Sequence, residues 1–531
     1  MTQIQDRNQV RSEELYEAAL TGPFGGVQSE LPLTEIEAFG FADVKNFIFR
    51  KGAAYVRPGW TALPPFPLTP NEPIMAVADF FNINGDHIQC VITPTKLWQW
   101  VTGIQNWTQI IGPAFSGSPS QLFAWDVLNY VLCFSQGVDK VFTWDGIAAA
   151  YVQSSVNAQP AKYIAEIGLH LVVVNPAFPQ RYYWTGIGDP TDWTSFSSGL
   201  NDNVNNLGPI NGVLKIGQYG FGFHRNGILQ IIPTGIGLAP FNFQSIINAS
   251  QGCIAPYSLS HFDDQGRELA VYLGVDNVYV FDGSSVEPIG DMPIDQRRRL
   301  GARSRILADV STVDTKTIYG FVTYEISGQV FRAYWLVFPG VSIWVYNFDE
   351  ANWTQLTYGN KVISSTGSFF KNAGIRIMDL VGTIQAQTWS PSSLTLNNQF
   401  LGFLLGFNDG TAGYVDFTNY SEIPAGITSG KLIFGDRRHK KAVKKFRLSF
   451  IDLGPTTFTI FLANEQGQNK SFTFTVGSGS GDVLNYIQEF NIPGLRFQYT
   501  VSVPEFSATA IVELAPIWDL AGEQRGGLLE N

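Results

Sequence analysis

The sequence predicts an all-β protein in which an irregular β-propeller of about six blades is followed by a C-terminal antiparallel β-sandwich. Three observations lead to this prediction. A phrase of strand and turn residues recurs along the middle of the chain, and the segments after residue 430 alternate between apolar and polar positions. Aromatic residues make up 14% of the sequence and charged residues only 15%. Such a composition favours strands that bury large rings between sheets.

The recurring phrase is a triplet of β-branched or aromatic residues, then an acidic or amide turn, and often a Trp or Tyr that enters the next strand. Copies lie at residues 97–100 with 107–109, 141–146 with 151, 182–184 with 192–194, 278–283, and 343–346 with 352–355. Corresponding triplets begin at residues 97, 141, 182, 228, 278 and 343, so the spacing lengthens after the third triplet. A repeat of roughly 40 to 50 residues is typical of a propeller blade, because one four-stranded sheet cannot bury both faces alone.

We expect three parts, at residues 1–73, 74–425 and 426–531. The first contains one short amphipathic helix within residues 6–20, then an extended segment, rich in Gly and Pro, that leads into the ring and clasps it. A weaker hairpin at residues 401–417 is expected to close the propeller. Strands of the sandwich are expected at residues 446–450, 457–461, 471–475 and 497–501, because apolar and polar positions alternate there.

Charge and cysteine content narrow the classes of function. The formal net charge is −11 and the sequence pI is about 5.0, which disfavours a free-standing nucleic-acid-binding protein. Cys90, Cys133 and Cys253 have no metal-ligand spacing and form no disulfide framework, as expected for a reducing cytoplasm. We expect neither a signal peptide nor a membrane span, because no apolar stretch has the required length.

Motifs for catalysis are missing, so we expect a protein without enzymatic activity, metal or cofactor. The five histidines are scattered, and there is no nucleophile elbow, phosphate loop or dinucleotide fingerprint. Residues 201–206 carry oxygen ligands suited to calcium, but a polar loop is the favoured interpretation. The alternative function is a carbohydrate-binding or glycan-degrading propeller, whose hydrolytic form would need two carboxylates to meet at the axis.

Two sets of side chains are candidates for assembly and packing. The predicted subunit or adaptor interface, favoured over contact with DNA phosphates, consists of Arg297, Arg298, Arg299, Arg303, Arg305, Arg437, Arg438, Lys440 and Lys441. The aromatic residues predicted to pack between blades are Trp98, Trp107, Trp144, Trp184, Trp193, Trp344 and Trp353. Arginine suits an interface because its guanidinium forms oriented, two-pronged contacts, and Trp suits a space between sheets because its ring is large.

Two regions resemble known proteins. The residues concerned are Gly25-Gly26-Val27, Leu31-Pro32, Asn46-Phe47, Arg50-Lys51-Gly52 and Arg57-Pro58-Gly59, and the run Arg181-Tyr182-Tyr183-Trp184-Thr185-Gly186-Ile187-Gly188-Asp189-Pro190-Thr191-Asp192-Trp193. They resemble the propeller-containing tail nozzle or tail accessory proteins of short-tailed bacteriophages, which include tail tube and DNA-stabilising proteins. The resemblance covers mainly residues 22–200. In the second run, Asp189-Pro190 favours a tight turn that Asp192 can cap, and Trp193 is expected to fill the space between blades.

The resemblance implies a structural protein of the virion. Such proteins assemble in the host cytoplasm as a ring, commonly a hexamer, below the portal and adaptor of the tail. They extend the DNA channel, contact fibres or other tail proteins, take part in genome retention and ejection, and let double-stranded DNA pass without sequence specificity. The later blades and the C-terminal sandwich match no motif of these proteins, so the resemblance leaves the position within the tail open.

Overall fold

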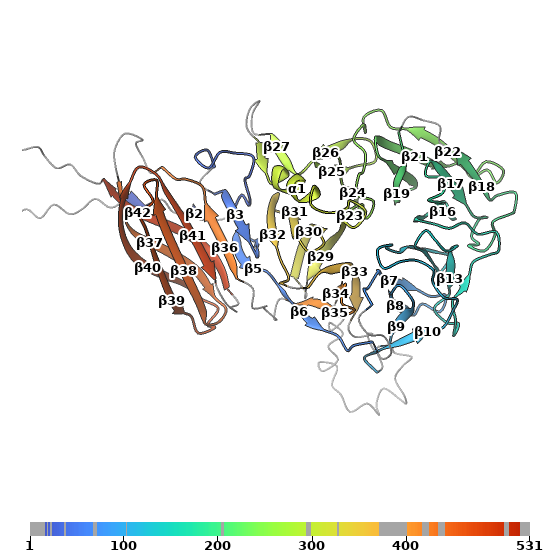
Figure 1. Cartoon of the computed structure of the whole chain (residues 1–531), viewed down its shortest axis with the longest axis horizontal. Coiled ribbons are helices and arrows are strands. Elements are labelled where there is room, and N and C mark those ends of the chain that lie inside the picture. The colour runs from blue at the N-terminus through green and yellow to red at the C-terminus, as the bar shows by residue number, and fades with distance from the viewer. Residues whose placement is uncertain are drawn as a thin grey trace, which may run out of the picture. The chain divides into compact units, whose positions relative to one another are not determined.

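The computed structural model describes residues 16–17, 20–21, 24–36, 39–66, 72–101, 104–202, 207–293, 299–326, 329–359, 361–370, 401–416, 424–433, 441–503 and 509–520. The described chain is almost entirely β-structure, which confirms the predicted all-β class (Figure 1). It divides into two compact units, one of residues 1–57 with 422–531 and one of residues 58–421. The described residues before residue 58 therefore belong with the C-terminal part, whereas the sequence predicted a separate part of residues 1–73.

The described part of the unit of residues 58–421 contains seven sets of four antiparallel strands, and six of these sets are meanders of consecutive strands (Figure 1). The first four sets are β7 (Ala76–Phe81), β8 (His87–Ile92), β9 (Leu97–Val101), β10 (Asn106–Ile110); β11 (Ala124–Leu128), β12 (Val131–Ser135), β13 (Phe142–Trp144), β14 (Val152–Gln153); β15 (Tyr163–Ile167), β16 (His170–Val174), β17 (Arg181–Trp184), β18 (Gly199–Asp202); and β19 (Ile210–Ile216), β20 (Tyr219–His224), β21 (Gly227–Pro233), β22 (Phe241–Ser245).

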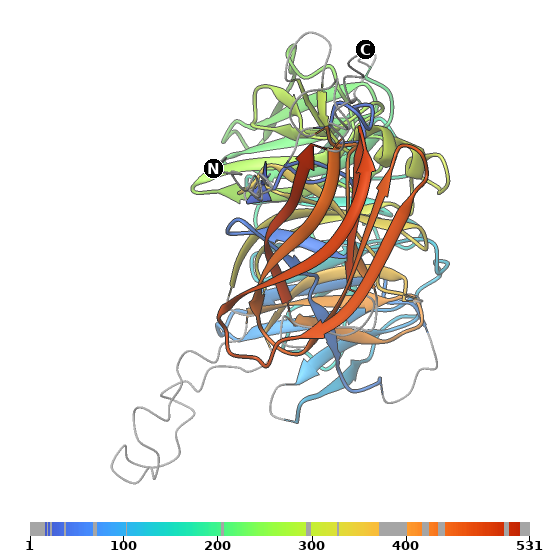
Figure 2. The ribbon, with the colours of Figure 1, turned by 90° about the vertical axis from the view of Figure 1, so that its left-hand side faces the viewer.

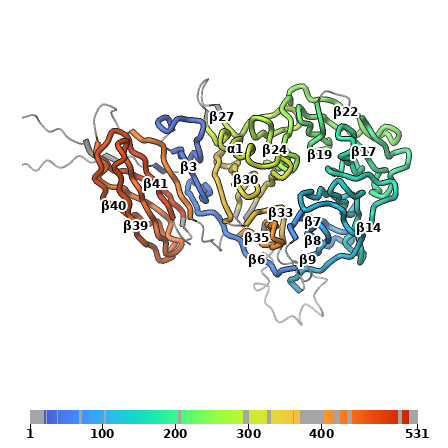
Figure 3. The backbone as a smooth tube through the Cα atoms, viewed as in Figure 1, coloured from blue at the N-terminus to red at the C-terminus, as the bar shows by residue number. Residues whose placement is uncertain are grey.

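The last three sets are β23 (Ser260–Asp264), β24 (Arg267–Leu273), β25 (Val278–Phe281), β26 (Val286–Pro288); β29 (Tyr319–Ile326), β30 (Gln329–Phe338), β31 (Ser342–Asn347), β32 (Asn352–Leu356); and β33 (Ile363–Phe370), β34 (Leu401–Phe407), β35 (Ala412–Asp416) with β6 (Gly59–Ala62). The first strand of each set contacts the first strand of the next, and β33 contacts β7. The series of sheets therefore closes into a ring, which Figure 3 follows along the backbone.

Closure of the ring uses a strand from the start of the unit. β6 pairs antiparallel with β35, with Trp60 opposite Val415 and Thr61 opposite Tyr414. The seventh sheet is thus built from both ends of the unit. The sequence predicted about six blades, whereas the described strands of this unit form seven sets of four. The hairpin of β34 and β35 looks incomplete until the N-terminal strand is added to it.

Aromatic rings connect neighbouring sheets around most of the ring. Ring pairs at six junctions are Phe80 with Trp144, Trp184 with Phe241, Phe221 with Phe281, Phe262 with Phe348, Phe321 with Phe403, and Phe369 with Trp100, with centroids 3.9 to 6.0 Å apart. At the remaining junction, Leu128 and Val141 of one sheet share a buried cluster with Ile164 and Tyr183 of the next. Each sheet therefore buries its faces on its neighbours, at roughly 25 cal/mol for each Å² of apolar surface.

Carboxylate and amide side chains shape the turns that follow third strands. Asp145 Oδ1 accepts hydrogen bonds from the backbone N–H of Ile147 and Ala148, at 2.9 and 2.7 Å. Asp282 Oδ1 accepts in the same way from Ser284 and Ser285, at 2.8 and 2.7 Å. These side chains satisfy donors that no strand partner reaches. This local chemistry is the physical reason for the acidic position in the recurring sequence phrase.

Helical structure lies elsewhere than the sequence predicted. Within the expected helix of residues 6–20, the described residues Tyr16–Glu17 (β1) and Leu20 are strand residues that pair with β42 (Thr509–Leu520), and the rest lies outside the described residues. An edge strand satisfies the backbone there without helical hydrogen bonds. The single described α-helix, α1 (Arg303–Val310), follows the hairpin of β27 (Asp291–Pro293) and β28 (Arg299–Gly301) between the fifth and sixth sheets.

The other unit contains two groups of antiparallel strands, whose long members run side by side in Figure 2. One group is β1, β2 (Leu20–Thr21), β4 (Phe47–Arg50), β5 (Ala53–Val56), β37 (Lys441–Asp452), β40 (Val483–Gly494) and β42 (Thr509–Leu520); the other is β3 (Phe41–Lys45), β36 (Ala425–Ser429), β38 (Thr456–Asn464), β39 (Asn469–Val476) and β41 (Phe497–Val503). The groups meet through rings, such as Phe446 with Tyr499 at 5.1 Å and Phe450 with Phe458 at 4.9 Å. The sequence found the four expected strands and missed β40 and β42.

A buried carboxylate fixes the turn between β39 and β40. Asp452, at the end of β37, accepts backbone hydrogen bonds from Ser478, Gly479 and Ser480 at 2.8 to 3.1 Å and hydroxyl hydrogen bonds from both serines. The N–H donors of Gly479 and Ser478 hold the pKa of the Asp452 carboxyl well below its usual range. Backbone N–H groups in the Gly-rich run of residues 477–481 therefore surround the Asp452 carboxylate, which accepts their hydrogen bonds.

We predict that Asp452→Asn lowers the melting temperature of this unit at neutral pH, because an amide offers one acceptor oxygen and turns its own N–H₂ toward donors. A depressed folded-state pKa contributes stability above the unfolded value of about 3.9, and this is lost as the pH falls toward the folded value. Melting curves between pH 2 and pH 7 should therefore fall more steeply on acidification for the parent protein than for the variant. Asp482→Asn, in the same turn, is the control. Parallel curves for the parent and Asp452→Asn would contradict this role.

We also predict that Gly413→Val destabilises the ring unit by about 1–3 kcal/mol through overpacking. A Cβ at Gly413 would lie 2.2 Å from Trp60 Cε3 and 2.6 Å from the Thr61 carbonyl oxygen, so a larger residue separates β35 from β6. Chemical denaturation measures the effect. Gly454→Val is the matched control, because a Cβ there meets no atom within 4 Å. Equal stabilities for both variants would show that the ring does not depend on this pairing.

Candidate functional site

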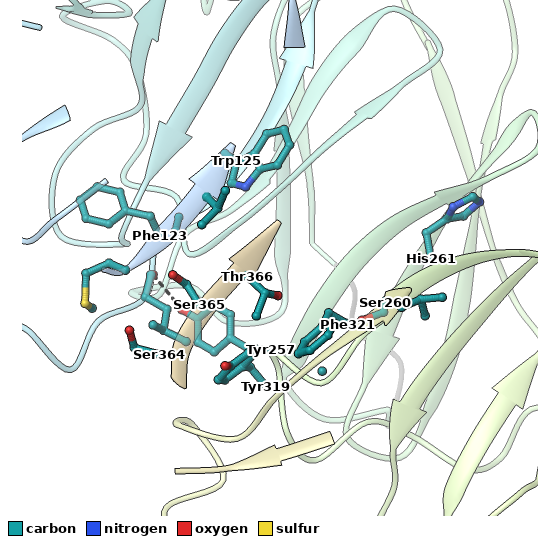
Figure 4. Close-up of a pocket in the computed structure, with 16 residues that line it drawn as sticks. Phe123, Trp125, Tyr257, Ser260, His261, Tyr319, Phe321, Ser364, Ser365 and Thr366 are labelled. Carbon is teal, nitrogen blue, oxygen red and sulfur yellow. Dashed lines mark hydrogen bonds between the residues drawn. The ribbon is translucent and has the colours of Figure 1, made fainter. Parts of the chain in front are cut away.

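A cavity of about 330 Å³ lies among the first strands of the sheets. Its walls come from β7, β11, β23, β29 and β33 and from the residues just before them, and Figure 4 shows its side chains. A second cavity, of about 400 Å³, shares Met75, Leu122, Tyr319 and Ser364 with it. Propellers and related rings commonly place binding sites where first strands converge, because side chains from several sheets reach one space there.

The lining of the first cavity, here called the axial cavity, consists of apolar and neutral polar side chains together with one imidazole. Its aromatic residues are Phe123, Trp125, Tyr257, Tyr319 and Phe321; its hydroxyl residues are Ser260, Ser364, Ser365 and Thr366; and His261 completes the polar set. Among these described lining residues there is no carboxylate, lysine or arginine. The two carboxylates that a hydrolytic propeller would place at the axis are therefore not part of this cavity.

Two hydroxyl groups on residues of the axial cavity are buried without a hydrogen-bond partner among the described atoms. Tyr257 Oη donates to the Leu122 carbonyl at 3.1 Å and Ser364 Oγ to the Ile74 carbonyl at 2.7 Å. Tyr319 Oη and Ser365 Oγ are buried and bond to nothing among the described atoms. Burial also raises the pKa of the Tyr319 phenol well above its ordinary value, so the phenol stays protonated and can donate. An unpaired buried hydroxyl costs about 1–3 kcal/mol, so these two make the packing around the cavity less stable.

A separate polar group links three neighbouring first strands. Asp126 on β11 accepts hydrogen bonds from the backbone N–H of Glu166 at 2.6 Å and of Val127 at 2.7 Å. Glu166 on β15 in turn pairs with Lys215 on β19. Burial raises the pKa of the half-buried Asp126 carboxyl to about 6, against the opposing effect of the two N–H donors. This arrangement joins sheets, and its carboxylates are already occupied by backbone or lysine partners.

Most of the predicted packing tryptophans lie between sheets. Trp98 and Trp107 belong to a buried cluster with Phe369, Leu404 and Tyr414 of the seventh sheet. Trp144 and Trp184 form the ring pairs given above. Trp353 Nε1 donates to the carbonyl of Ile289, in the connection from the fifth sheet, at 2.6 Å.

Two further tryptophans donate hydrogen bonds to segments that connect the strands or sheets. Trp344 Nε1 donates to Asp309 of α1 at 2.8 Å, and the Trp344 side chain is buried. Trp193 lies against the aliphatic junction of the second and third sheets, and its Nε1 donates to Ser154 Oγ at 3.0 Å. Asp189 and Asp192 accept backbone hydrogen bonds within the same loop, as the turn chemistry of this run predicted.

The predicted basic interface is only partly described. Arg303 and Arg305 lie on α1, and Arg303 Nε donates to the Asp276 carbonyl at 2.6 Å. Arg299 is known only as a strand residue of β28, and Arg297, Arg298, Arg437, Arg438 and Lys440 lie outside the described residues. The expectation of an exposed Lys441 is wrong. Lys441 begins β37, which is paired on both sides by β40 and β42, so the residue is fully buried.

Histidines and the proposed oxygen ligands have structural partners. His224 bonds to Tyr182 Oη at 2.9 Å and to the Gly208 carbonyl at 2.8 Å, and His170 bonds to the Thr185 carbonyl at 2.6 Å. Asp202 pairs with Arg181, while residues 203–206 lie outside the described part. Within the described ranges, no group of three or more His, Cys, Asp or Glu side chains is placed to hold a metal ion.

Sequence reasoning missed a patch of apolar turn residues on the ring. It consists of Tyr130, Leu169, Ile187, Phe196, Ile236 and Leu238, all exposed, and we call it the turn patch. Their turns touch: Gly188 N donates to the Leu169 carbonyl at 2.7 Å, and Asn129 Nδ2 donates to the Gly188 carbonyl at 3.3 Å. A Cβ on Gly237 would lie 2.9 Å from Phe196, so that ring lies against the next turn. The sequence feature that could have revealed the turn patch is an apolar residue within each of these otherwise polar turns.

Comparisons with known proteins add little to this geometry. No protein-family model and no curated protein matches the sequence. One solved structure to which the chain is similar is the crystal structure of BBS1N in complex with ARL6DN, soaked with mercury. That match has a TM-score of 0.37 and 10% identity, and covers 68% of this chain and 97% of that chain. A likeness at this level carries no argument about function.

The described ranges contain no helix that could span a membrane. The α-helix there, α1, has eight residues, and no helix is long and apolar enough to cross a bilayer.

We predict that Asp126 makes the ring less stable as the pH rises from about 4 to about 6. Its folded-state pKa of about 6 exceeds the unfolded value of about 3.9, so the folded protein binds more protons in that window. The melting temperature of Asp126→Asn, relative to the parent protein, should therefore rise between pH 4 and pH 7. Asp314→Asn, at an exposed turn, is the control and should show no such trend. A constant difference between Asp126→Asn and the parent would contradict the raised pKa.

Proposed function

We propose that this chain is a structural subunit of a bacteriophage tail, in which copies assemble into a ring that extends the DNA channel below the portal and adaptor. The ring of seven sheets would be an irregular β-propeller, and the unit of two facing sheets a β-sandwich. The protein would act by shape and surface, holding the genome and letting it leave, without enzymatic chemistry. Assembly would take place in the host cytoplasm, and a hexamer is the stoichiometry that the resemblance to tail nozzle proteins implies.

The observation that carries this proposal is the turn patch. Phe196 and Leu238 are 74% and 80% exposed, and the other members are also mostly exposed. A contiguous group of large apolar side chains on a protein surface is typical of an interaction site. We propose that the turn patch packs against a neighbouring copy in the assembled ring. In a cyclic assembly each copy contacts the next copy through the same surface. A single patch on each chain can therefore contribute to every interface of the ring.

The acidic residues in the same turns support a channel through which DNA passes without binding to the protein. Every meander places its first-to-second and third-to-fourth turns at one end of the sheets, and carboxylates recur there. Examples are Asp145, Asp189, Asp192 and Asp282, each of which accepts hydrogen bonds from its own turn. Carboxylates on a surface repel phosphates. A surface of this kind suits contact with protein partners or a channel wall better than binding to DNA.

The experiment is to purify the full chain and measure its mass in solution by native mass spectrometry and light scattering. We predict ring-sized oligomers, and we predict that Phe196→Asp with Leu238→Asp raises the concentration needed for assembly at least about tenfold, because a charge would be buried in the interface. Both residues are exposed in the single chain, so folding should be unaffected. Ile247→Asp is the matched control. Ile247 is 92% exposed, but follows β22 and so lies at the other end of the sheet.

Two results would overturn the proposal. One is a parent protein that stays monomeric at concentrations up to those of a virion-producing extract and that does not join tail particles. The other is turnover of a glycan by the purified chain, which would favour the alternative of a carbohydrate-degrading propeller. If Ile247→Asp weakens assembly as much as the double variant does, the interface lies at the opposite end of the sheets and the turn patch is not the contact.

A further inference from the structure

We propose that the edge strand β39 pairs antiparallel with β39 of a second copy of this chain, so that the sheets of two copies join across a two-fold axis. The proposal goes beyond the tail function and does not depend on it. β39 is the last strand of its group and pairs only with β38 among the described strands. Its other side therefore presents backbone N–H and C=O groups that no described strand satisfies.

The edge formed by β39 is long and regular. Its eight residues lie opposite residues 456–463 of β38 one to one, without a register shift. By contrast, the outer strands of the first five ring sheets have only two to five residues. Short edges are one way in which proteins avoid pairing with other chains. β39 does not have this protection.

β39 also lacks most other features that protect an edge. It contains no proline, and its one charged residue, Lys470, is next to its start and donates to the Phe490 carbonyl of β40. The edge strand of the other group, β40, is different. It contains Pro493, and its pairing with β37 shifts register beside Asn491, whose φ is +54°. The β40 edge is therefore interrupted, whereas the β39 edge is continuous.

The inner face of β39 carries aromatic rings that its own chain covers only in part. Phe472 contacts Phe490 at 5.1 Å, and Phe474 stacks on Tyr486 at 3.5 Å, so both rings lie between the two strand groups. Phe472 and Phe474 nevertheless remain partly exposed. A strand added beside β39 would cover them and remove apolar surface from water.

The residues of β39 are arranged almost symmetrically about Thr473, which identifies a second copy as the added strand. In an antiparallel pair centred on this residue, each Thr473 faces its counterpart and Ser471 faces Thr475. On the inner face, Phe472 lies opposite Phe474 of the other copy. Hydroxyl groups thus meet hydroxyl groups and rings meet rings, and both kinds of cross-strand pair stabilise antiparallel sheets.

Hydroxyl pairs of this kind already exist one strand further in. Thr459 on β38 bonds to Thr473 at 2.9 Å, and Thr457 bonds to Thr475 at 2.8 Å. The proposed contact continues this row of hydroxyl groups from one copy into the next.

Charge and symmetry set the size and strength of the assembly. The pairing places Lys470 opposite Val476 of the other copy, so no like charges face each other. Because the contact is self-complementary, each β39 edge is used once and the assembly through this edge ends at two copies. A single strand pair buries less surface than most stable interfaces, so we expect a weak dimer with a Kd on the order of 100 µM.

The test uses the full-length chain with Phe196→Asp and Leu238→Asp, so that contact through the turn patch does not obscure the result. Sedimentation from about 10 µM to about 1 mM should show a monomer–dimer equilibrium. Thr473→Lys and Thr473→Glu should each weaken the dimer at least about tenfold, because two like charges would face each other at the two-fold axis. An equimolar mixture of these two variants should pair again, as a mixed dimer.

Thr459→Lys is the matched control, because it removes the same hydrogen bond between Thr459 and Thr473 and places the same charge on the same face. Its two lysines would be three strand spacings of about 4.8 Å apart, roughly 14 Å, where salt screens them. Thr459→Lys should therefore dimerise like its parent. All variants should melt alike at about 1 µM, a concentration well below the expected Kd, where the chain is monomeric.

Cross-linking tests the register of the pair. Cys90, Cys133 and Cys253 are buried, so a cysteine introduced on β39 is the accessible thiol. In Thr473→Cys, a short bis-maleimide should join two copies, because directly opposed Cβ atoms lie about 4.5–5.5 Å apart. Thr459→Cys should give no cross-linked dimer.

Three results would overturn the proposal. They are a chain that stays monomeric at about 1 mM, roughly ten times the expected Kd, a Thr459→Lys variant that dimerises as weakly as Thr473→Lys, and a mixture of the Lys and Glu variants that does not pair. A Thr473→Cys variant that is not cross-linked while the dimer is present would exclude the register centred on this residue and overturn the proposal as well.

Failure of this test is distinguishable from failure of the proposed function. Ring assembly is measured with an intact turn patch, and pairing through β39 is measured with the turn patch disrupted. A chain that forms rings but shows no dimer dependent on Thr473 would retain the tail role and lose this contact. A chain that pairs through β39 but forms no ring would do the reverse.

Discussion

The structure depends on closing a ring of sheets, none of which can bury both of its faces alone. Each four-stranded sheet is apolar on two sides, so a linear row would leave two faces in water at its ends. Pairing of β6 with β35 completes the seventh sheet, and contact of β33 with β7 closes the series. Trp60 and Gly413 illustrate how tight that closure is, since a single added carbon at Gly413 would meet the indole. The N-terminal strand is therefore required by the fold, although it lies far from β35 in the sequence.

Closure also determines which side chains remain available for function. Large rings such as Trp184, Phe241 and Phe281 are used between sheets, and carboxylates such as Asp145 and Asp282 are used inside their own turns. The remaining surfaces are of two kinds. One is the apolar turn patch, which no element of the chain covers among the described residues. The other is the axial cavity, where first strands converge without filling the space between them.

Sequence reasoning was most successful where local chemistry fixes the structure. The triplets that begin at residues 97, 141 and 278 are strands β9, β13 and β25 or adjoin them, and the acidic turns after residues 144 and 281 have the expected hydrogen bonds. Period-two alternation also found β37 and β38. These features depend on residues within one hairpin, so a single sequence contains the information.

Features that depend on distant pairing could not be predicted in the same way. Residues 59–62 look like part of a Gly-rich loop until β35 is beside them. Spacing of Leu15, Tyr16 and Ala19 permits a helix, but β42 offers a strand edge instead. Lys441 looked like surface because it ends a basic run, yet two neighbouring strands enclose it. The unpaired hydroxyls of Tyr319 and Ser365 are also invisible in sequence, since an unsatisfied group is defined by what surrounds it.

Hydrogen–deuterium exchange of the backbone amides of residues 59–62 tests the central claim most directly, because it reports whether the closing strand is part of the cooperative ring. We predict that these amides are protected to the same extent as those of β34 and β35, and that they lose protection together with them when denaturant is added. Rapid exchange of residues 59–62 while β33 to β35 stay protected would contradict the account, since the ring would then hold together without its N-terminal strand.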